Sequence, residues 1–119
     1  MGVAYEVIIK GYFDAAHFLR GYPGKCERVH GHRYEAIVSV KVEELSEIGI
    51  AYDFSVLRRR LNEVIDKLDH TLLNDTPPFD RINPSAENIA RFIYQELDEP
   101  HASSVQVWES PQSGVTYHP

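Results

Sequence analysis

Hydrophobic and polar positions alternate along two long stretches in the first third of the chain. In residues 3–13 the apolar positions are mostly odd, and in residues 30–43 they are even. Alternation is typical of strands with one buried face, because successive side chains point to opposite sides of a sheet. Since only about a dozen residues separate the stretches, and "GYPG" at 21–24 has turn composition, we expect the two strands to pair.

Two helical segments and a hairpin are predicted after these strands. Asp53 is placed to cap a helix whose apolar positions recur at helical spacing, namely Phe54, Leu57, Leu61, Val64, Ile65 and Leu68. The tandem prolines of "NDTPPFD" (74–80) end this pattern, since proline fixes φ and removes a donor. Ser85 is placed to cap a second helix, with an apolar stripe of Ala86, Ile89, Ala90, Ile93 and Leu97. Residues 104–110 and 115–119, joined by a turn at 111–114, complete a hairpin.

The order β-β-α-α-β-β predicts the fold class. Strands and helices that do not alternate one by one favour α+β over α/β, with a mainly antiparallel sheet. We therefore expect a four-stranded antiparallel sheet with two helices packed on one face. A chain of 119 residues is long enough for one core, so residues 1–119 are expected to form a single domain.

Composition narrows the possible partners. The net charge is −6 and the longest run of like charge is the three arginines at 58–60, which argues against nucleic acid or an anionic membrane as the main partner. No apolar run approaches the roughly 20 residues of a membrane span. Cys26 is the single cysteine, which excludes an intramolecular disulfide and fits a reducing, cytoplasmic location.

Three histidines share the predicted core-facing parity. His30 and His32 lie two residues apart on the even side of the second strand, and the odd side of the first strand reaches His17 if it extends past Phe13. Three neutral imidazoles form the open type of zinc site, which leaves a fourth position for water or substrate. A lone histidine is more often a satisfied polar residue, but three that converge favour zinc.

A carboxylate is predicted to face the same side. Val105 and Val107 give the last long strand an odd apolar parity, which turns Glu109 inward. Burying a carboxylate without a partner costs roughly several kcal/mol of folding free energy. Glu109 must therefore be paired or functional. Two interpretations remain open: an ion pair with Arg or Lys, or recognition of a flat N–H/NH₂ edge such as that of a pterin or guanine.

Two further candidates are ambiguous from the residues alone. Asp69 and His70 are adjacent, as suits general acid–base chemistry, but His70 also fits a favourable place at a helix C-terminus. Cys26 could be a small buried hydrophobe, although the polar, partly basic loop around it would lower the pKa of a thiol and so suits a base or nucleophile.

The chain resembles the family of 6-pyruvoyl- and 6-carboxy-tetrahydropterin synthases over nearly its whole length. The matching segments are "FDAAH" (13–17), "CERVHGHRY" (26–34), "GIAYDF" (49–54), "LDHTLLN" (68–74), "PSAEN" (84–88) and "VWES" (107–110). Each segment alone would be a weak signal, but their order and separation together are highly specific. Ser85 stands where the family usually has Thr, a departure that affects packing and leaves the chemistry intact.

The resemblance implies roles for the residues found above. Zinc would be bound by His17, His30 and His32, catalysis would use Cys26, Asp69 and His70, and Glu109 would anchor the pterin. It also implies the tunnelling fold (T-fold), with trimers stacked into a homohexamer and active sites between subunits. The substrate would be 7,8-dihydroneopterin triphosphate, with Lys25, Arg28 and Arg33 as candidate cations for the triphosphate.

The spacing of Cys26 and His30 favours one branch of the family. Three residues separate them, as is typical of the bacterial 6-carboxy-tetrahydropterin synthases of 7-deazaguanine and queuosine synthesis. The pyruvoyl-forming branch has a longer insert, and the folate branch uses a glutamate, which Glu27 leaves open. Two alternatives of other classes are a zinc-dependent hydrolase or hydratase, which would leave Cys26 and Glu109 unexplained, and a non-catalytic zinc-stabilised interaction module with Cys26 as fourth ligand.

Overall fold

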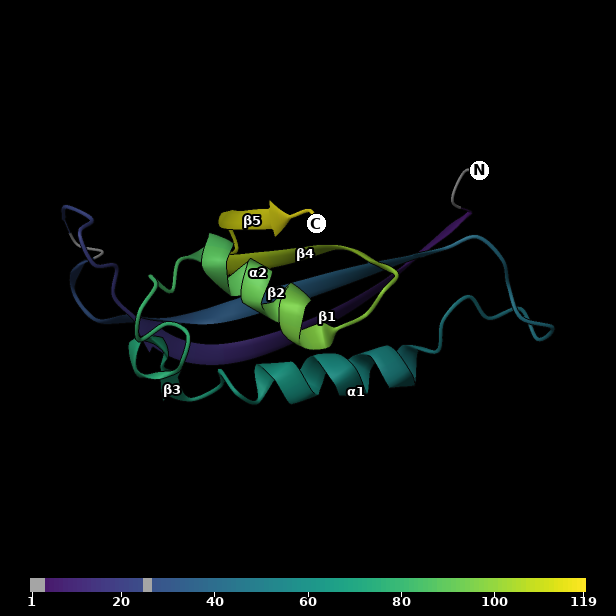
Figure 1. The fold of residues 1–119 in the computed structure, drawn as a ribbon, viewed down its shortest axis with the longest axis horizontal. Helices are drawn as coiled ribbons and strands as arrows, with labels where there is room; N and C mark the ends of the chain where they lie inside the picture. The colour runs from purple at the N-terminus through teal and green to yellow at the C-terminus, as the bar shows by residue number, and fades with distance from the viewer. Residues whose placement is uncertain (1–3, 25–26) are drawn as a thin grey trace.

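The structure, a computed structural model, describes residues 4–24 and 27–119. A long, twisted sheet with the strand order β3-β1-β2-β4-β5 carries both helices against one of its faces (Figure 1). This arrangement confirms the α+β class. The molecule is elongated along its two longest strands, with extents of 53 × 25 × 25 Å.

The two longest strands form the predicted pair. Strand β1 (Tyr5–His17) runs antiparallel to β2 (His30–Val42), with a continuous register from Tyr5 opposite Val42 to His17 opposite His30. The odd side chains of β1 and the even ones of β2 face the helices. Strand β1 continues without interruption past Phe13 to His17. The predicted alternation therefore turns the histidines at this end of the hairpin toward the inward face.

Both helices begin at their predicted caps. Helix α1 (Phe54–Ile65) starts after Asp53, whose carboxylate accepts from the Ser55 N–H at 2.8 Å. Helix α2 (Ala86–Leu97) starts after Ser85, whose hydroxyl accepts from the Asn88 N–H at 3.2 Å. Each cap satisfies one of the free N–H groups of a first helical turn. Phe54, the first residue of α1, is 61% exposed and lies outside the stripe that Leu57, Leu61, Val64 and Ile65 bury.

The sheet has one strand more than the sequence predicts. Strand β3 (Thr71–Leu72) pairs in parallel with Ala15 and Ala16 of β1 and leads into the short 3-10 helix η2 (Leu73–Asp75). The sheet is therefore five-stranded and mixed: the four predicted strands pair antiparallel, and the predicted number of strands was short by β3. Two residues are too few to show a period of two, so only the contact with β1 defines this strand. The closing hairpin of β4 (Ala102–Ser110) and β5 (Ser113–Tyr117) is confirmed.

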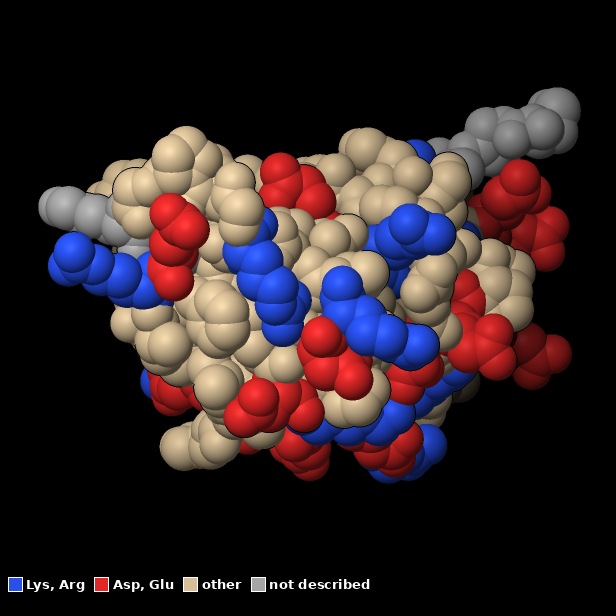
Figure 2. Space-filling view, turned by 60° about the vertical axis from the view of Figure 1, so that its left-hand side comes forward, with Lys and Arg blue, Asp and Glu red and all other residues tan. Residues whose placement is uncertain are grey.

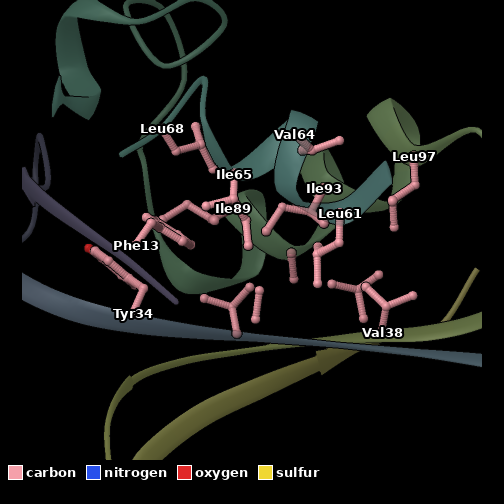
Figure 3. Close-up of a cluster of buried hydrophobic side chains, with 14 of the residues drawn as sticks. Phe13, Tyr34, Val38, Leu61, Val64, Ile65, Leu68, Ile89, Ile93 and Leu97 are labelled. Atoms are coloured by element: carbon pink, nitrogen blue, oxygen red, sulfur yellow. The ribbon is translucent and has the colours of Figure 1, made fainter. Parts of the chain in front are cut away.

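The core lies between the inward face of the sheet and the two helices. Figure 3 shows Phe13 and Tyr34 lying flat against each other, with Leu61, Ile65 and Ile89 of the helices facing the sheet. The two aromatic rings are stacked with centroids 4.8 Å apart. This stack fixes the part of β1 and β2 that leads into the histidine end of the hairpin.

One face of the molecule carries charged side chains of both signs (Figure 2). On the face drawn in Figure 2, Lys and Arg side chains are interspersed with Asp and Glu. With a net charge of −6, this face lacks the continuous basic surface that a nucleic acid backbone binds. Within residues 4–24 and 27–119, neither helix combines the length and the hydrophobicity that crossing a membrane requires.

A buried ion pair joins α1 to the turn between α2 and β4. Glu99 is 6% exposed, and its carboxylate accepts from Arg60 at 2.9 Å, from the Tyr52 hydroxyl at 2.7 Å and from the His101 N–H at 2.8 Å. Arg60 also donates to the Leu97 carbonyl oxygen at 2.6 Å. Burial alone would raise the pKa of Glu99, but these donors and the Arg60 charge lower it below the ordinary value, so the carboxylate is kept ionised.

An Arg60→Ala variant is expected to lose about 3 kcal/mol in the free energy of unfolding, the low end for breaking a buried ion pair. The low end applies because Glu99 keeps two other donors. Urea denaturation measures the loss. Arg58→Ala is the matched control, since Arg58 is exposed on the same helix. Equal stability of the two variants would contradict a stabilising role for the Arg60–Glu99 pair.

Candidate active site

Three histidines meet at one end of the β1–β2 hairpin, on its inward face. One ring nitrogen from each of His17, His30 and His32 lies within 4.8 Å of the others, and His17 Nε2 is 3.0 Å from His30 Nε2. His17 is almost completely buried, while His30 and His32 are partly exposed. We call these side chains the imidazole trio. The structure thus brings together the residues whose parity predicts convergence.

Hydrogen bonds to carbonyl oxygens fix the tautomers of two of the rings. The Nδ1 of His17 is 2.7 Å from the Pro84 carbonyl oxygen, and the Nδ1 of His30 is 2.7 Å from that of Arg28. A carbonyl oxygen only accepts, so both Nδ1 atoms carry the proton. In the neutral rings the two Nε2 lone pairs then face each other, an arrangement that a cation between them would stabilise.

Burial favours the neutral, metal-binding form of His17 and His32. The pKa of His17 is lowered, chiefly by burial, and burial also lowers the pKa of His32 against the opposing charge of Glu109. A proton shared between His17 and His30 would require a charged imidazolium, which burial disfavours. A metal ion requires unprotonated Nε2 atoms instead.

His32 leaves its inward nitrogen without a hydrogen bond. His32 Nε2 is buried and has no hydrogen-bond partner among the described residues. Glu109 Oε2 lies 3.3 Å away, close enough for an ion pair but outside hydrogen-bonding geometry. Buried polar atoms are rarely left unpaired, so this nitrogen points to a missing ligand. The donor set fits a zinc ion on three imidazoles with an open fourth position.

Two asparagine side chains hold the segment that carries the Pro84 carbonyl. The Asn74 amide exchanges two hydrogen bonds of 3.0 Å with the backbone of Phe18, and Asn83 exchanges bonds of 2.9 and 3.0 Å with the backbone of Arg20. These amides continue the pairing of β1 beyond its last residue. They place Pro84 beside His17, and sequence reasoning missed both of them. The only signal was an asparagine at the end of "LDHTLLN" and another before "PSAEN".

Glu109 lies near the end of β4, next to the trio. Val105 and Val107 are fully buried, as their parity predicts, but the Glu109 side chain is 34% exposed. The ladder of β4 and β5 shifts register between Trp108 and Ser110, which opens the strand at Glu109. Within the described residues its carboxylate contacts His32, at 3.3 Å, and makes no ion pair with the Arg or Lys that a purely structural role would supply.

Asp69 and His70 form a second group together with Asp14. Asp69 Oδ1 accepts from the Asp14 N–H at 2.8 Å, and Asp69 Oδ2 lies 2.9 Å from His70 Nδ1. The hydrogen bond from Asp14 is the main cause of the lowered pKa of Asp69, with a further contribution from His70. The His70 ring is 78% exposed on a backbone with φ +57°, an uncommon value for a residue other than glycine. Asp14 was missed by sequence reasoning.

The two groups lie on opposite sides of the sheet. Asp14 is one position out of phase with Ala15 and His17 on β1, so its side chain points outward, where it pairs with Arg33 at 3.5 Å. The Asp14 and Asp69 carboxylates and His70 have ligand atoms within 4.8 Å of one another. The structure of one chain therefore does not bring Asp69 and His70 to the imidazole trio. Cys26 lies outside the described residues.

The fold and the histidine arrangement match one protein family. A family model described as 6-pyruvoyl tetrahydropterin synthase matches residues 6–119. The structure of a Caenorhabditis elegans 6-pyruvoyl tetrahydropterin synthase superposes with a TM-score of 0.83 at 26% identity, covering 100% of this chain and 99% of that chain. The chain belongs to the 6-pyruvoyl tetrahydropterin synthase family and has its tunnelling fold, as the sequence resemblance implies.

Two curated relatives carry a more particular name. The 6-carboxy-5,6,7,8-tetrahydropterin synthase of Synechocystis sp. is 39% identical over 113 residues, covering 88% of this chain and 86% of the relative. The enzyme of the same name from Bacillus subtilis is 36% identical over 121 residues, covering 91% of this chain and 81% of the relative.

Proposed function

We propose that this protein is a 6-carboxy-5,6,7,8-tetrahydropterin synthase. It would convert 7,8-dihydroneopterin triphosphate to 6-carboxy-tetrahydropterin, with release of acetaldehyde and triphosphate, in cytoplasmic 7-deazaguanine and queuosine synthesis. The observation that carries the proposal is the imidazole trio with Glu109 beside it, 3.3 Å from His32. The names of the Synechocystis and Bacillus relatives support this branch of the family.

Zinc would be held by His17, His30 and His32. When bound, it supplies a Lewis acid for the hydroxyl groups of the substrate side chain. The Pro84 and Arg28 carbonyl oxygens keep the Nδ1 protons in place, so that the Nε2 atoms are directed at the metal.

Glu109 would bind the flat edge of the pterin. A carboxylate has two acceptor oxygens, which match the parallel N–H and NH₂ donors of a pyrimidine ring. The partial exposure of Glu109 leaves it open to a ligand. Its position beside His32 would hold the pterin side chain close to the trio.

Cys26, Asp69 and His70 would move the protons of the reaction. The Cys26 thiolate would remove a proton from the substrate side chain, and the Asp69–His70 pair would supply or remove a second one. Asp69 orients the His70 ring through its contact with Nδ1, which leaves the other ring nitrogen for the substrate. Side-chain oxidation offsets ring reduction, so the conversion needs no redox cofactor.

The site would be completed between chains of a homohexamer. In one chain the trio faces inward, while Asp69 and His70 lie beside the outward-pointing Asp14. A neighbouring chain that presents its Asp69–His70 pair to the trio would assemble all the proposed groups in one place. Sedimentation or light scattering measures the assembly.

The product distinguishes this proposal from its alternatives. Incubation with 7,8-dihydroneopterin triphosphate and mass analysis of the pterin is the direct test. A 6-pyruvoyl product, which the name of the Caenorhabditis elegans neighbour favours, or a hydroxymethyl product of the folate branch would overturn the carboxy assignment. No conversion would favour a zinc-dependent hydrolase or a non-catalytic zinc-stabilised module.

A Glu109→Gln variant is expected to weaken pterin binding more than it weakens the fold. The amide removes the charge and one of two acceptors, and charge-assisted hydrogen bonds contribute about 1.5–3 kcal/mol, so we expect roughly a tenfold or greater rise in KM. Steady-state kinetics and thermal unfolding measure the two effects. An unchanged KM with lower thermal stability would mean that Glu109 is a structural ion-pair partner and the pterin binds elsewhere.

A further inference from the structure

Tyr34 has a buried hydroxyl group that the proposed mechanism does not use. The residue is fully buried, and its hydroxyl oxygen has no hydrogen-bond partner among the described residues. Leaving a buried hydroxyl unpaired costs stability, so native proteins rarely do so without a reason. Phenylalanine would fill the same space without this cost.

The unpaired hydroxyl belongs to the active-site end of the core. The Tyr34 ring makes edge contacts with His17 and His32, at centroid distances of 5.8 and 5.4 Å. In residues 4–24 and 27–119, the buried side-chain atoms without a partner are His32 Nε2 and this hydroxyl. Two unpaired atoms on one strand, two residues apart, indicate that both find their partners only when the site is occupied.

Glu109 is the acceptor that the sheet places nearest to Tyr34 in register. Glu35 pairs with Trp108 across β2 and β4, so Tyr34 and Glu109 are the next residues along the two strands and share the inward face. Glu109 now lies against His32 Nε2, at 3.3 Å, where a metal ion would take its place. A carboxylate released from His32 has the Tyr34 hydroxyl as a donor on the same face.

The Tyr34 ring itself has little freedom to move. It is stacked on Phe13 with an interplanar angle of 10°, and Figure 3 shows its hydroxyl oxygen directed away from the rest of the labelled core. A donor held by such packing is pre-organised, so it can fix an acceptor without a large loss of side-chain freedom.

We propose that Tyr34 is a positioning residue whose hydroxyl donates a hydrogen bond to Glu109 when the site is occupied. This inference rests on the proposed function, because it assigns Glu109 to the pterin edge. The hydrogen bond would hold one oxygen of the Glu109 carboxylate in place. The remaining lone pairs of the carboxylate would then face the pterin, and affinity would rise without any contact between Tyr34 and the pterin.

The test compares Tyr34→Phe with the wild-type protein, both loaded with zinc, using neopterin as a fluorescent probe. We expect unchanged zinc content and a 5–10-fold weaker Kd for neopterin in Tyr34→Phe. Tyr94→Phe is the control: Tyr94 is a partly buried tyrosine that packs on Tyr117, whose strand partner Val105 lies four residues before Glu109. It should bind neopterin like the wild type.

A double-mutant cycle separates positioning from a general effect on packing. In a Glu109→Ala background, where no side-chain acceptor remains at this position, Tyr34→Phe should cause less than a twofold further change in Kd. A full, additive loss in that background would overturn the inference, because Tyr34 would then act without Glu109.

Thermal unfolding of the ligand-free, metal-free protein gives a readout that does not depend on pterin. Tyr34→Phe should unfold at the wild-type temperature or above it, since it removes an unpaired polar group. A lower unfolding temperature would show a structural partner and overturn the inference. Wild-type protein that fails to bind neopterin contradicts the proposed function and the inference together, whereas normal wild-type binding with no loss in Tyr34→Phe contradicts the inference alone.

Discussion

A His32→Ala variant is expected to purify without stoichiometric zinc while it keeps its fold. Loss of an outer partner of a metal ligand costs about 10–100-fold in affinity, and loss of one of three ligands is expected to cost more. His32 suits this experiment better than His17, because its side chain is 24% exposed and truncation leaves no closed cavity in the core. Metal analysis after dialysis measures the effect.

The same variant predicts how the protein responds to a chelator. Binding to the folded state stabilises it by mass action, so zinc removal should lower the unfolding temperature of the wild type. His32→Ala should unfold at a temperature that no longer depends on the chelator. His101→Ala is the control, since His101 is exposed and lies outside the trio. Full zinc content in His32→Ala would contradict the assignment of the trio as the metal site.

A Cys26→Ala variant is expected to bind zinc and pterin normally and to lose most of its turnover. A positioned general base contributes roughly 10²–10⁴-fold to rate, and we expect a fall of that size in kcat with little change in KM. Glu27 is adjacent and could act in place of the thiol. The double variant Cys26→Ala/Glu27→Gln therefore belongs in the same series, with Glu27→Gln alone as its control.

The zinc content of Cys26→Ala separates the enzyme from a zinc-stabilised module. A closed four-ligand site would use Cys26 as its fourth ligand. Removal of the Cys26 thiol would then weaken zinc binding as strongly as removal of the His32 imidazole. Wild-type turnover in both Cys26→Ala and the double variant would mean that the cysteine is not the base. The carboxy assignment would then lack its central catalytic residue, and a zinc-hydroxide mechanism would explain more.

The main elements of the fold could be predicted because their signals are local. The period of two in β1 and β2 identified both strands and the face that each one buries, and the caps at Asp53 and Ser85 marked both helix starts. Strand β3 could not be predicted in this way. It has two residues, and parallel pairing with Ala15 and Ala16, more than fifty positions away in the chain, is what makes it a strand.

The candidate site, too, has parts that local sequence signals predict and parts that they do not. Parity by itself brought His17, His30 and His32 to one face, because side-chain direction in a strand follows from position alone. The family, too, was evident from the order and spacing of short motifs, and the comparisons confirm it. The roles of Cys26, Asp69, His70 and Glu109 stay predictions from that resemblance.

Only the tertiary structure decided what surrounds these residues. The Pro84 carbonyl that sets the His17 tautomer and the amides of Asn74 and Asn83 come from segments remote in sequence, and hydrogen bonds between such segments leave no periodic signal. The separation of the Asp69–His70 pair from the trio likewise depends on which face Asp14 occupies after the strands pair. The unpaired Tyr34 hydroxyl is the clearest case: its sequence position predicts burial, but a missing partner becomes visible only when every neighbour is in place.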